Sequence, residues 1–534
     1  MKTDRTIPIV VGVTGHRKIR PEDYAALYSA VKTELEKLKN YCPNSPIVML
    51  NSLAEGGDLL CAEAAEELDI PIIAALPRAR ESCEQDFSEE AKKRFAHHCS
   101  RAEQVFVTSP AEALPENGEN RDFQFRQAGI YVATHCHVLL ALWDGGPGTK
   151  AACGTAEAVD FALKGNFQPR DYVPLYAEES RVVIHILTPR SEHKGEAAGT
   201  IHLLGNHEAV RKTLRETDEF NERVQRAEPV TKSRLPEAVP DDPVLERMES
   251  ISLTAGKQSS FYARRFRLIL GLIAMVSSIL TLAFLLYDEA QMIGMILVCG
   301  VMLAAAWGFQ RYAVRTDCHR RYVEYRALAE CLRVQTYLRY AGSGLETAEL
   351  LTWTQREETA WITAALRALS VGSLPKEAHE IRMCWVEEQR NYHQKAGKQA
   401  KQRTTVSGRI VNTALVLSVA LYCFALGYEL LCGDLIFEPV IRIADGEVCR
   451  TVLKILLGTI SASTLFTANY YGKLSLPRTL SDHEKMERFY GRISALLNQY
   501  GQTELLLKTL AREELIENGN WVSYQRDNKP EISF

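Results

Sequence analysis

Three short loops in the first third of the chain combine glycines with side chains that could bind an anion or transfer a proton. The first follows the apolar run at 7–13, the second lies at 52–58 and the third at 144–157. Glycine lets backbone N–H groups approach a phosphate closely, and a helix that starts after such a loop presents its positive end to an anion. The candidate ligand-binding residues in these loops and in one neighbouring helix are Gly15, His16, Arg17, Glu55, Gly56, Gly57, Asp58, Arg126, Asp144, Gly145, Gly154, Thr155 and Glu157.

Each loop has a structural alternative. A glycine after a strand more often marks a turn than a ligand site. His16 and Arg17 could instead cap a helix, and Glu157 could be a first-turn glutamate that the helix dipole favours. Three such loops at the strand ends of one sheet nevertheless favour a phosphate-bearing ligand. Neither the GxGxxG dinucleotide fingerprint nor a GxxxxGK[ST] phosphate loop occurs in them.

The elements that must position these loops alternate between apolar runs and amphipathic segments. The predicted strands lie at 7–13, 46–50, 70–76, 104–107, 138–143 and 181–187, and helices are predicted at 21–38, after residue 58, at 122–135 and at 155–164. Buried parallel strands are continuous apolar runs separated by helices. We therefore predict a doubly wound, Rossmann-like α/β domain, which binds ligands at the carboxyl ends of its strands.

Four motifs in this region resemble those of the SLOG superfamily: GVTGHR at 12–17, SLAEGGD at 52–58, LWDG at 142–145 and GTAE at 154–157. That group includes the cytokinin-activating LOG enzymes, the DprA proteins, and nucleotide-sensing domains of bacterial defence systems and melastatin-type TRP channels. The resemblance covers about residues 5–190 and implies binding of a nucleotide or an NAD-derived small molecule. It implies that Gly15 and His16 lie beside the ligand, that Gly154 and Thr155 hold phosphate, and that Glu157 reaches a ribose.

The third loop departs from the PGGxGTxxE loop of LOG-type hydrolases. Pro147 falls inside the glycine run, and Glu157 follows Gly154-Thr155 by two positions instead of three. Because acid–base catalysis depends on the placement of the carboxylate, this displacement favours sensing over cleavage of an N-glycosidic bond. No catalytic residue is assigned; in the alternative hydrolase, Glu157 or Asp58 would be the general base.

Length and composition limit the classes of protein to which the chain can belong. The chain has 534 residues, too many for one ordinary domain, and its net charge of −4 argues against a nucleic-acid-binding protein driven by bulk charge. Thirteen cysteines without a CxxC pair or zinc-type spacing favour reduced thiols. We expect no metal site, no resident cofactor and no nucleic-acid partner.

Four segments without Asp, Glu, Lys or Arg lie at 268–287, 291–310, 410–428 and 455–472. Each approaches the roughly 20 apolar residues that a bilayer-spanning helix needs. Lysines and arginines cluster where the first and third segments begin and where the second and fourth end. The positive-inside rule therefore predicts a multi-pass protein of the inner (cell) membrane with cytoplasmic termini. The alternative is a set of buried helices in a large soluble core.

The sequence AGKQ occurs at 255–258 and again at 396–399, each time shortly before an apolar segment. This favours two related two-span modules. The motif YxxYRxxAExLRxQ at 322–335 resembles the SLATT family, whose two-span modules accompany SLOG domains and are proposed to form pores. The alternative interpretation of its charges is a solvated helix face with i,i+4 ion pairs.

The predicted organisation is an α/β SLOG-like domain followed by an all-α, four-span membrane domain with cytoplasmic helical extensions. The domain boundaries are 1–205 for the SLOG-like domain, 206–250 for a linker, 251–345 for the first two-span module, 346–386 for a helical connector, 387–505 for the second module and 506–534 for a tail. We predict a homo-oligomeric membrane effector, in antiviral defence by resemblance, in which a nucleotide or NAD-derived ligand gates a pore across the lipid bilayer. The alternative is a membrane-anchored nucleotide or N-glycoside hydrolase.

Overall fold

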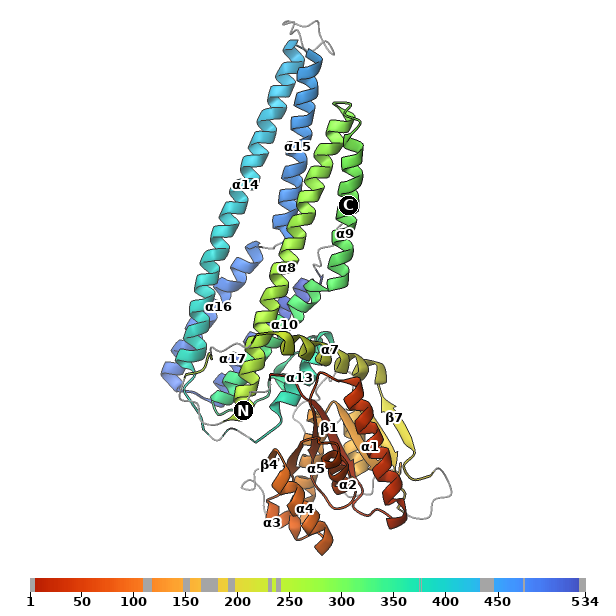
Figure 1. Cartoon of the computed structure of the whole chain (residues 1–534). Coiled ribbons are helices and arrows are strands. Elements are labelled where there is room, and N and C mark those ends of the chain that lie inside the picture. The colour runs from red at the N-terminus through yellow and green to blue at the C-terminus, as the bar shows by residue number, and fades with distance from the viewer. Residues whose placement is uncertain are drawn as a thin grey trace. The chain divides into compact units, whose positions relative to one another are not determined.

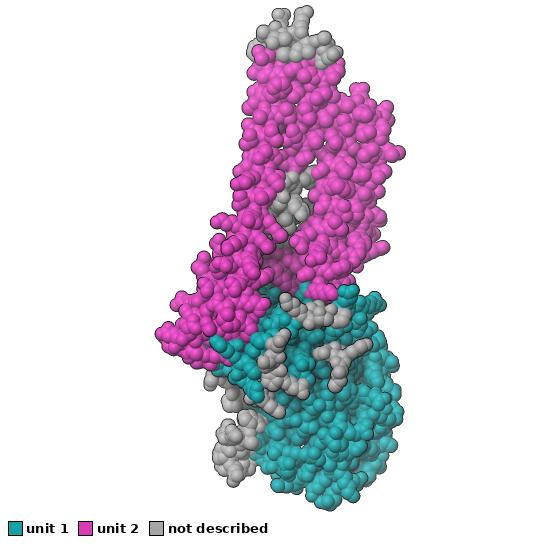
Figure 2. All heavy atoms as spheres, turned by 60° about the vertical axis from the view of Figure 1, so that its left-hand side comes forward, with its two compact units in different colours: residues 1–256, 327–380, 504–520 teal, residues 257–326, 381–503, 521–534 magenta. Residues whose placement is uncertain are grey.

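The computed structural model divides the chain into two compact units, each assembled from three stretches of sequence (Figure 2). Unit 1 comprises residues 1–256, 327–380 and 504–520, and unit 2 comprises residues 257–326, 381–503 and 521–534. The residues that the structure describes are 5–108, 118–146, 154–164, 181–190, 197–228, 233–236, 242–373, 375, 377–432, 446–473 and 476–527.

Unit 1 contains a seven-stranded sheet with the order β4-β3-β2-β1-β5-β6-β7 (Figure 1). The strands are β1 (Ile9–Gly15), β2 (Ile47–Asn51), β3 (Ile72–Leu76), β4 (Gln104–Val107), β5 (Val138–Trp143), β6 (Val182–Leu187) and β7 (Ile201–Gly205). All neighbouring pairs are parallel except β6 with β7. The α/β parallel-sheet prediction is therefore confirmed, and the antiparallel edge strand β7 is an addition that the sequence analysis missed.

Helices cover both faces of this sheet. They are η1 (Pro21–Asp23), α1 (Tyr24–Tyr41), α2 (Gly57–Glu67), α3 (Arg80–Glu84), α4 (Glu89–Arg101), α5 (Gly118–His135), α6 (Thr155–Lys164) and α7 (His207–Arg226). Because side chains alternate along a strand, Ile9, Val11 and Val13 of β1 join one core with α1, α2 and α4. Val10 joins the opposite core with α5 and α6.

The segment predicted as a linker contains the amphipathic helix α7. Its apolar side chains Leu214 and Phe220 are buried. The buried Asn221 accepts a hydrogen bond from the Ile7 N–H and donates one to the Ile7 carbonyl, both at 2.8 Å. These bonds satisfy both backbone groups of Ile7, two residues before β1, so α7 belongs to the α/β core. The sequence analysis mistook the polar face of this helix for a linker.

Helical segments from later in the chain also belong to unit 1. They are the second half of α10 (Cys318–Tyr340), α11 (Thr347–Leu350), α12 (Trp353–Glu358), α13 (Ala360–Ser370) and most of α17 (Glu504–Asp527). In α10 the Gln335 side chain accepts hydrogen bonds from the Thr347 N–H at 2.6 Å and hydroxyl at 2.9 Å. Arg333 pairs at 3.1 Å with the buried Glu514. The solvated-face interpretation of this motif is therefore wrong for its second half, which is a packing surface.

Three helices in the part of the chain that the structure describes are long and apolar enough to cross a membrane: Pro243–Asp288, Met295–Tyr340 and Arg382–Leu431. Their side chains include many exposed large apolar ones, such as Leu268, Leu297 and Val416, which are 62%, 71% and 65% exposed. Continuous apolar surface of this kind marks contact with lipid or with other protein. The individual elements are α8 (Pro243–Asp288), α9 (Met295–Thr316), η3 (Arg382–Glu387), α14 (Glu388–Cys432), α15 (Gly446–Lys473) and α16 (Leu476–Tyr500).

The fourth predicted span corresponds to α15, which is not one of these three helices and whose side chains beyond residue 464 lie outside the described part. Within unit 2, α15 packs beside α14. The Arg450 guanidinium donates two hydrogen bonds to the Glu429 carboxylate of α14, at 2.7 and 2.8 Å. Gly458 lies against Leu285 of α8. These contacts pack α15 against other helices of unit 2. That α15 crosses a membrane stays a prediction.

The two AGKQ repeats occupy similar positions in the two helical modules. Gly256 on α8 faces Ala329 on α10, and Gly397 on α14 faces His483 on α16. A Cβ atom at either glycine would lie 3.9 or 3.6 Å from the Cβ of its facing residue. In both modules the repeat therefore faces the helix that follows the second apolar helix, as expected of two related modules.

Candidate functional site

A cavity of about 540 Å³ lies at the carboxyl end of β1, inside unit 1. Its walls are residues 13–18 at the end of β1, parts of the second loop, the first half of α5 and the start of α6. The sheet order places β2 on one side of β1 and β5 on the other, so the topological switch point lies beside this strand. Ligands of doubly wound sheets bind at that point, and the volume is within the range of small-molecule sites.

The structure brings together most of the predicted site residues. Those that line the cavity are Gly15, His16, Arg17, Asp58, Arg126, Gly154, Thr155 and Glu157. The others, which the structure does not place on the cavity wall, are Glu55, Gly56, Gly57, Asp144 and Gly145.

Glycines in the first two loops allow the loops to pack directly against each other. A Cβ atom at Gly15 would lie 2.9 Å from the Gly57 Cα, and one at Gly56 would lie 2.3 Å from the carbonyl oxygens of both His16 and Arg17. The Gly57 N–H donates a 3.0 Å hydrogen bond to the His16 carbonyl. Gly56 also has φ +98°, which favours glycine. The close packing of the two loops therefore explains why residues 56 and 57 are glycines. Gly56 and Gly57 would affect a ligand indirectly, because they hold the two loops together.

Glu55 is not one of the residues that line the cavity. Its carboxylate accepts a 2.7 Å hydrogen bond from the Ser88 hydroxyl. Ser88 in turn caps the N-terminus of α4, where its hydroxyl accepts from the Ala91 N–H. Glu55 thus contacts the N-cap residue of α4, and its predicted contact with a ligand stays a prediction.

Asp144, His16 and Arg190 form a polar cluster at the rim. The Arg190 guanidinium lies 2.9 Å from His16 Nδ1 and 3.2 Å from Asp144 Oδ2. The Asp144 backbone N–H donates to His16 Nε2 at 3.0 Å, and Asp144 Oδ1 lies 3.2 Å from the same nitrogen. Burial and the Arg190 charge lower the pKa of His16, although Asp144 opposes this effect. Asp144 therefore acts by positioning Arg190 and His16.

Asp58 is the acid whose pKa is most altered in the cavity. Its carboxyl is almost fully buried, and Oδ2 lies 3.3 Å from the Ala54 N–H. Burial raises the pKa of Asp58 to about 7, although the Ala54 and Gly15 N–H groups and the Arg17 charge oppose the shift. An acid with this pKa exchanges its proton near neutral pH, as a general acid or base must.

Substitution of Asp58 by asparagine is expected to stabilise the protein more at pH 8 than at pH 4.5. Between pH 4 and 7 the folded carboxyl holds a proton that the unfolded one has lost, so wild-type stability falls as the pH rises through this window. The change should be at least about 1 kcal/mol, since one unit of pKa corresponds to about 1.4 kcal/mol. Unfolding of both proteins in detergent at the two pH values measures it. An equal difference at both pH values would contradict the shifted pKa.

Cationic side chains outnumber acidic ones around the cavity. The cations are Arg17, Lys18, Arg121, Arg126 and Arg190, and the acids are Asp58, Asp122 and Glu157. Arg126 pairs with Glu157 at 2.8 Å, and Arg121 pairs with Asp86 at 2.5 Å. Within the part of the chain that the structure describes, Arg17 makes no ion pair. Its guanidinium instead lies 4.8 Å from the centre of the Phe125 ring. The cavity therefore favours an anion, and Phe125 offers it an aromatic face.

The third loop reaches the cavity through the start of α6. Gly154 precedes this helix, and its carbonyl accepts from the N–H groups of Glu157 and Ala158. Among the described residues, no atom lies within 4 Å of a Cβ atom built at Gly154, so none of them requires glycine there by packing. The positive end of α6 adds to the attraction for an anion. The rest of this loop, residues 147–153, lies outside the described residues, and so does the predicted role of Pro147.

Sequence reasoning missed more than half of the residues of the cavity wall, among them Lys18, Arg121, Phe125 and Arg190. The sequence positions of Arg190 and Arg121 gave a partial indication that they lie near the site. Arg190 follows strand β6 at the edge where ligands bind, and Arg121 lies near the start of α5. Neither stands in a glycine-containing motif, and their convergence depends on the order of strands in the sheet.

A scan against protein-family models and a search of curated proteins find no match for this chain. The resemblances to SLOG and SLATT proteins therefore stay predictions. The chemistry of the cavity and the apolar helices are the basis for a functional inference.

Proposed function

We propose that the α/β domain binds an anionic nucleotide or NAD-derived small molecule in the cavity beside β1. The observation that carries this proposal is the convergence of five cationic side chains and the start of α6 on one cavity at the switch point of the sheet. Charge-assisted hydrogen bonds from arginine suit phosphate groups especially well. Phe125, beside Arg17, suits a base or nicotinamide ring.

The helical half is proposed to be a four-span membrane domain that this ligand gates. Three apolar helices support the membrane part, and α15 supplies the proposed fourth span. Cations at the predicted inner ends support cytoplasmic termini and insertion in the inner (cell) membrane. Since four helices enclose no wide conduit, the pore would be built by a homo-oligomer. The ligand can shift the pore equilibrium only by its difference in affinity for the closed and open states.

Helix α5 offers a route for this coupling within unit 1. Its first half lines the cavity with residues such as Arg121 and Phe125. Its second half contacts the helical extension, where the Gly372 N–H donates to the Tyr131 hydroxyl at 3.1 Å and His135 Nε2 lies 2.8 Å from Glu346 Oε1. A ligand that shifts α5 would therefore act directly on the segment that continues from α10.

Replacement of Arg17 by glutamine is expected to weaken binding of an anionic ligand by about 10- to 100-fold. A hydrogen bond to a charged group contributes about 1.5–3 kcal/mol, and every 1.4 kcal/mol is tenfold in affinity. Calorimetric titration of the full chain in detergent with cyclic nucleotides and ADP-ribose derivatives measures this effect. Arg80→Gln is the matched control, because Arg80 pairs with Glu84 and does not line the cavity. Equal affinities for all three proteins would place the ligand elsewhere.

A second candidate function is hydrolysis of a nucleotide or N-glycoside, and the raised pKa of Asp58 inside the cavity favours it. Asp58 is better suited than Glu157 to act as general base, because Glu157 is paired with Arg126. Prolonged incubation with the same ligands and analysis of the products tests this function. Turnover that Asp58→Asn abolishes while binding persists would support the hydrolase. Binding of a ligand without formation of products would contradict the hydrolase and favour the proposed sensor.

A further inference from the structure

We infer that Glu66, His97 and His98 form a binding site for a late first-row divalent cation such as Zn²⁺. The site lies between α2 and α4, and none of its three residues lines the cavity. It is therefore a second site on the α/β domain, independent of the proposed anionic ligand.

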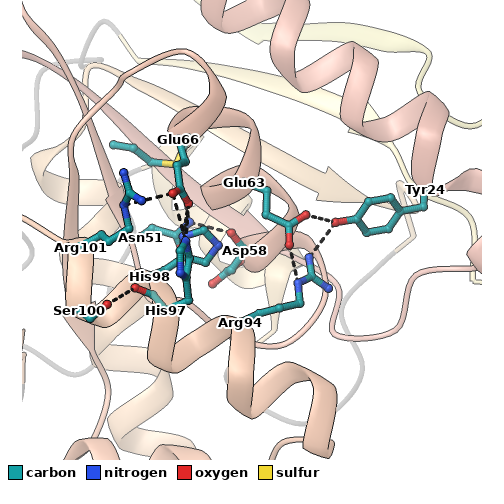
Figure 3. Close-up of polar contacts among 11 residues, drawn as sticks. Tyr24, Asn51, Asp58, Glu63, Glu66, Arg94, His97, His98, Ser100 and Arg101 are labelled. Atoms are coloured by element: carbon teal, nitrogen blue, oxygen red, sulfur yellow. Dashed lines mark hydrogen bonds and ion pairs between the residues drawn. The ribbon is translucent and has the colours of Figure 1, made fainter.

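Two helices bring the three side chains together. Glu66 lies in the last turn of α2, and the two histidines lie near the end of α4, which packs against α2. Figure 3 shows both imidazole rings beside the Glu66 carboxylate. His97 Nε2 is 3.0 and 2.9 Å from the two carboxylate oxygens, and His98 Nδ1 is 3.3 Å from Oε2. One atom from each residue lies within 4.8 Å of the other two.

These separations match those of ligands on one metal ion. Zinc binds nitrogen and carboxylate oxygen at about 2.0–2.2 Å, which places two tetrahedral ligands about 3.3 Å apart. Two imidazoles and one carboxylate are a donor set that suits Zn²⁺ and its late first-row neighbours. Three protein ligands leave one coordination position for water.

The buried nitrogen of His98 points to a cation in this cluster. His98 is 2% exposed, and its Nδ1 is buried without a hydrogen-bond partner while it faces a carboxylate oxygen. A lone pair and a carboxylate attract each other only through a proton or a metal ion between them.

The cluster is also accessible, and its charge is suitable. His97 is 50% exposed and opens a path for the ion. Arg101 Nε lies 3.1 Å from Glu66 Oε1, but its side chain is 64% exposed and can turn into solvent when a cation binds. The spacing rules used on the sequence missed this site, because the third ligand lies on a different helix 31 residues away from His97.

Zinc titration of the chelator-treated full chain in detergent, in competition with a chromophoric chelator, tests the site. We expect one ion per chain, and we expect His97→Ala and Glu66→Gln each to weaken binding by more than the roughly 10- to 100-fold that loss of an outer-shell partner costs. Glu90→Gln, an exposed carboxylate on α4, should bind like the wild type. Cobalt substitution should give the intense visible absorption of a four-coordinate ion, lost in both variants.

Two results would overturn the inference: no stoichiometric zinc on the wild type, or binding that both substitutions leave unchanged. His97 is the primary target because its exposure makes a folding defect unlikely to follow from truncation. Unfolding midpoints without metal check this directly. Since the test reads metal binding alone, its outcome is independent of the proposed nucleotide ligand.

Discussion

Gly56→Ala is expected to lower the stability of the α/β domain by roughly 2–6 kcal/mol, the sum of a strained backbone and an overpacked contact. The residue has φ +98°, and its new methyl group would lie 2.3 Å from two carbonyl oxygens. The first two loops would have to separate, which breaks the hydrogen bond from the Gly57 N–H to the His16 carbonyl. A loss of this size is a large part of the 5–15 kcal/mol that stabilises an ordinary domain.

The matched control for this prediction is Gly154→Ala. Its methyl group would meet no atom of the residues that the structure describes within 4 Å, so the stability of this variant should stay close to that of the wild type. The same methyl group enters the cavity wall at the start of α6, so it should weaken ligand binding. Unfolding curves in detergent and ligand titration separate the two effects. Equal stability of the two variants would show that the loops do not pack as described.

Glu346→Gln is expected to destabilise unit 1 by about 3 kcal/mol, because it breaks a largely buried ion pair and leaves one charge behind. His135 Nδ1 lies 2.8 Å from the Tyr131 carbonyl, and Nε2 lies 2.8 Å from Glu346 Oε1. The imidazole thus lies between two acceptor oxygens, and the substitution removes the carboxylate on its Nε2 side. Its side chain is only 5% exposed, so solvent cannot compensate for the lost carboxylate.

The pH dependence gives this prediction a second test. Burial opposes ionisation of Glu346, but His135, by its charge and hydrogen bond, and Arg367 hold the pKa of this carboxyl below its usual value. The stabilisation is therefore present above about pH 4.5 and is lost as the pH falls further. The difference in the free energy of unfolding between the wild type and Glu346→Gln should become smaller from pH 7 to pH 4. A double mutant with His135→Gln measures the coupling. A constant gap, or additive losses, would contradict the ion pair.

The sheet could be predicted from sequence because its signal is local. Runs such as those of β2 and β5 are buried on both faces, so each appears as an uninterrupted apolar segment. The loops that follow β1 and β2 could be predicted for the same reason, since Gly15 is the last residue of β1 and Gly56 lies five residues after the end of β2. The apolar helices are also local signals, because length and composition define them.

The rest of the site depends on contacts between distant segments. Nothing in the sequence near Asp144 indicates that Arg190 would pair with it, because β6 must first lie beside β5. Glu55 and Asp58 belong to one loop, yet only Asp58 lines the cavity, while Glu55 accepts a hydrogen bond from Ser88, 33 residues further along the chain. The helical pattern of α7 could be recognised from the sequence, but its place in the core could not, because amphipathic helices and charged linkers share a composition and differ in what covers their apolar side.

Ligand-dependent ion flux through proteoliposomes containing the full chain tests the central claim most directly. We predict that at least one anionic nucleotide or ADP-ribose derivative opens a conductance in the wild type. With Arg17→Gln, the same flux should need roughly 10- to 100-fold more ligand, in line with the expected loss of a charge-assisted hydrogen bond. A preparation that binds the ligand with wild-type affinity and shows no ligand-dependent flux would contradict gating.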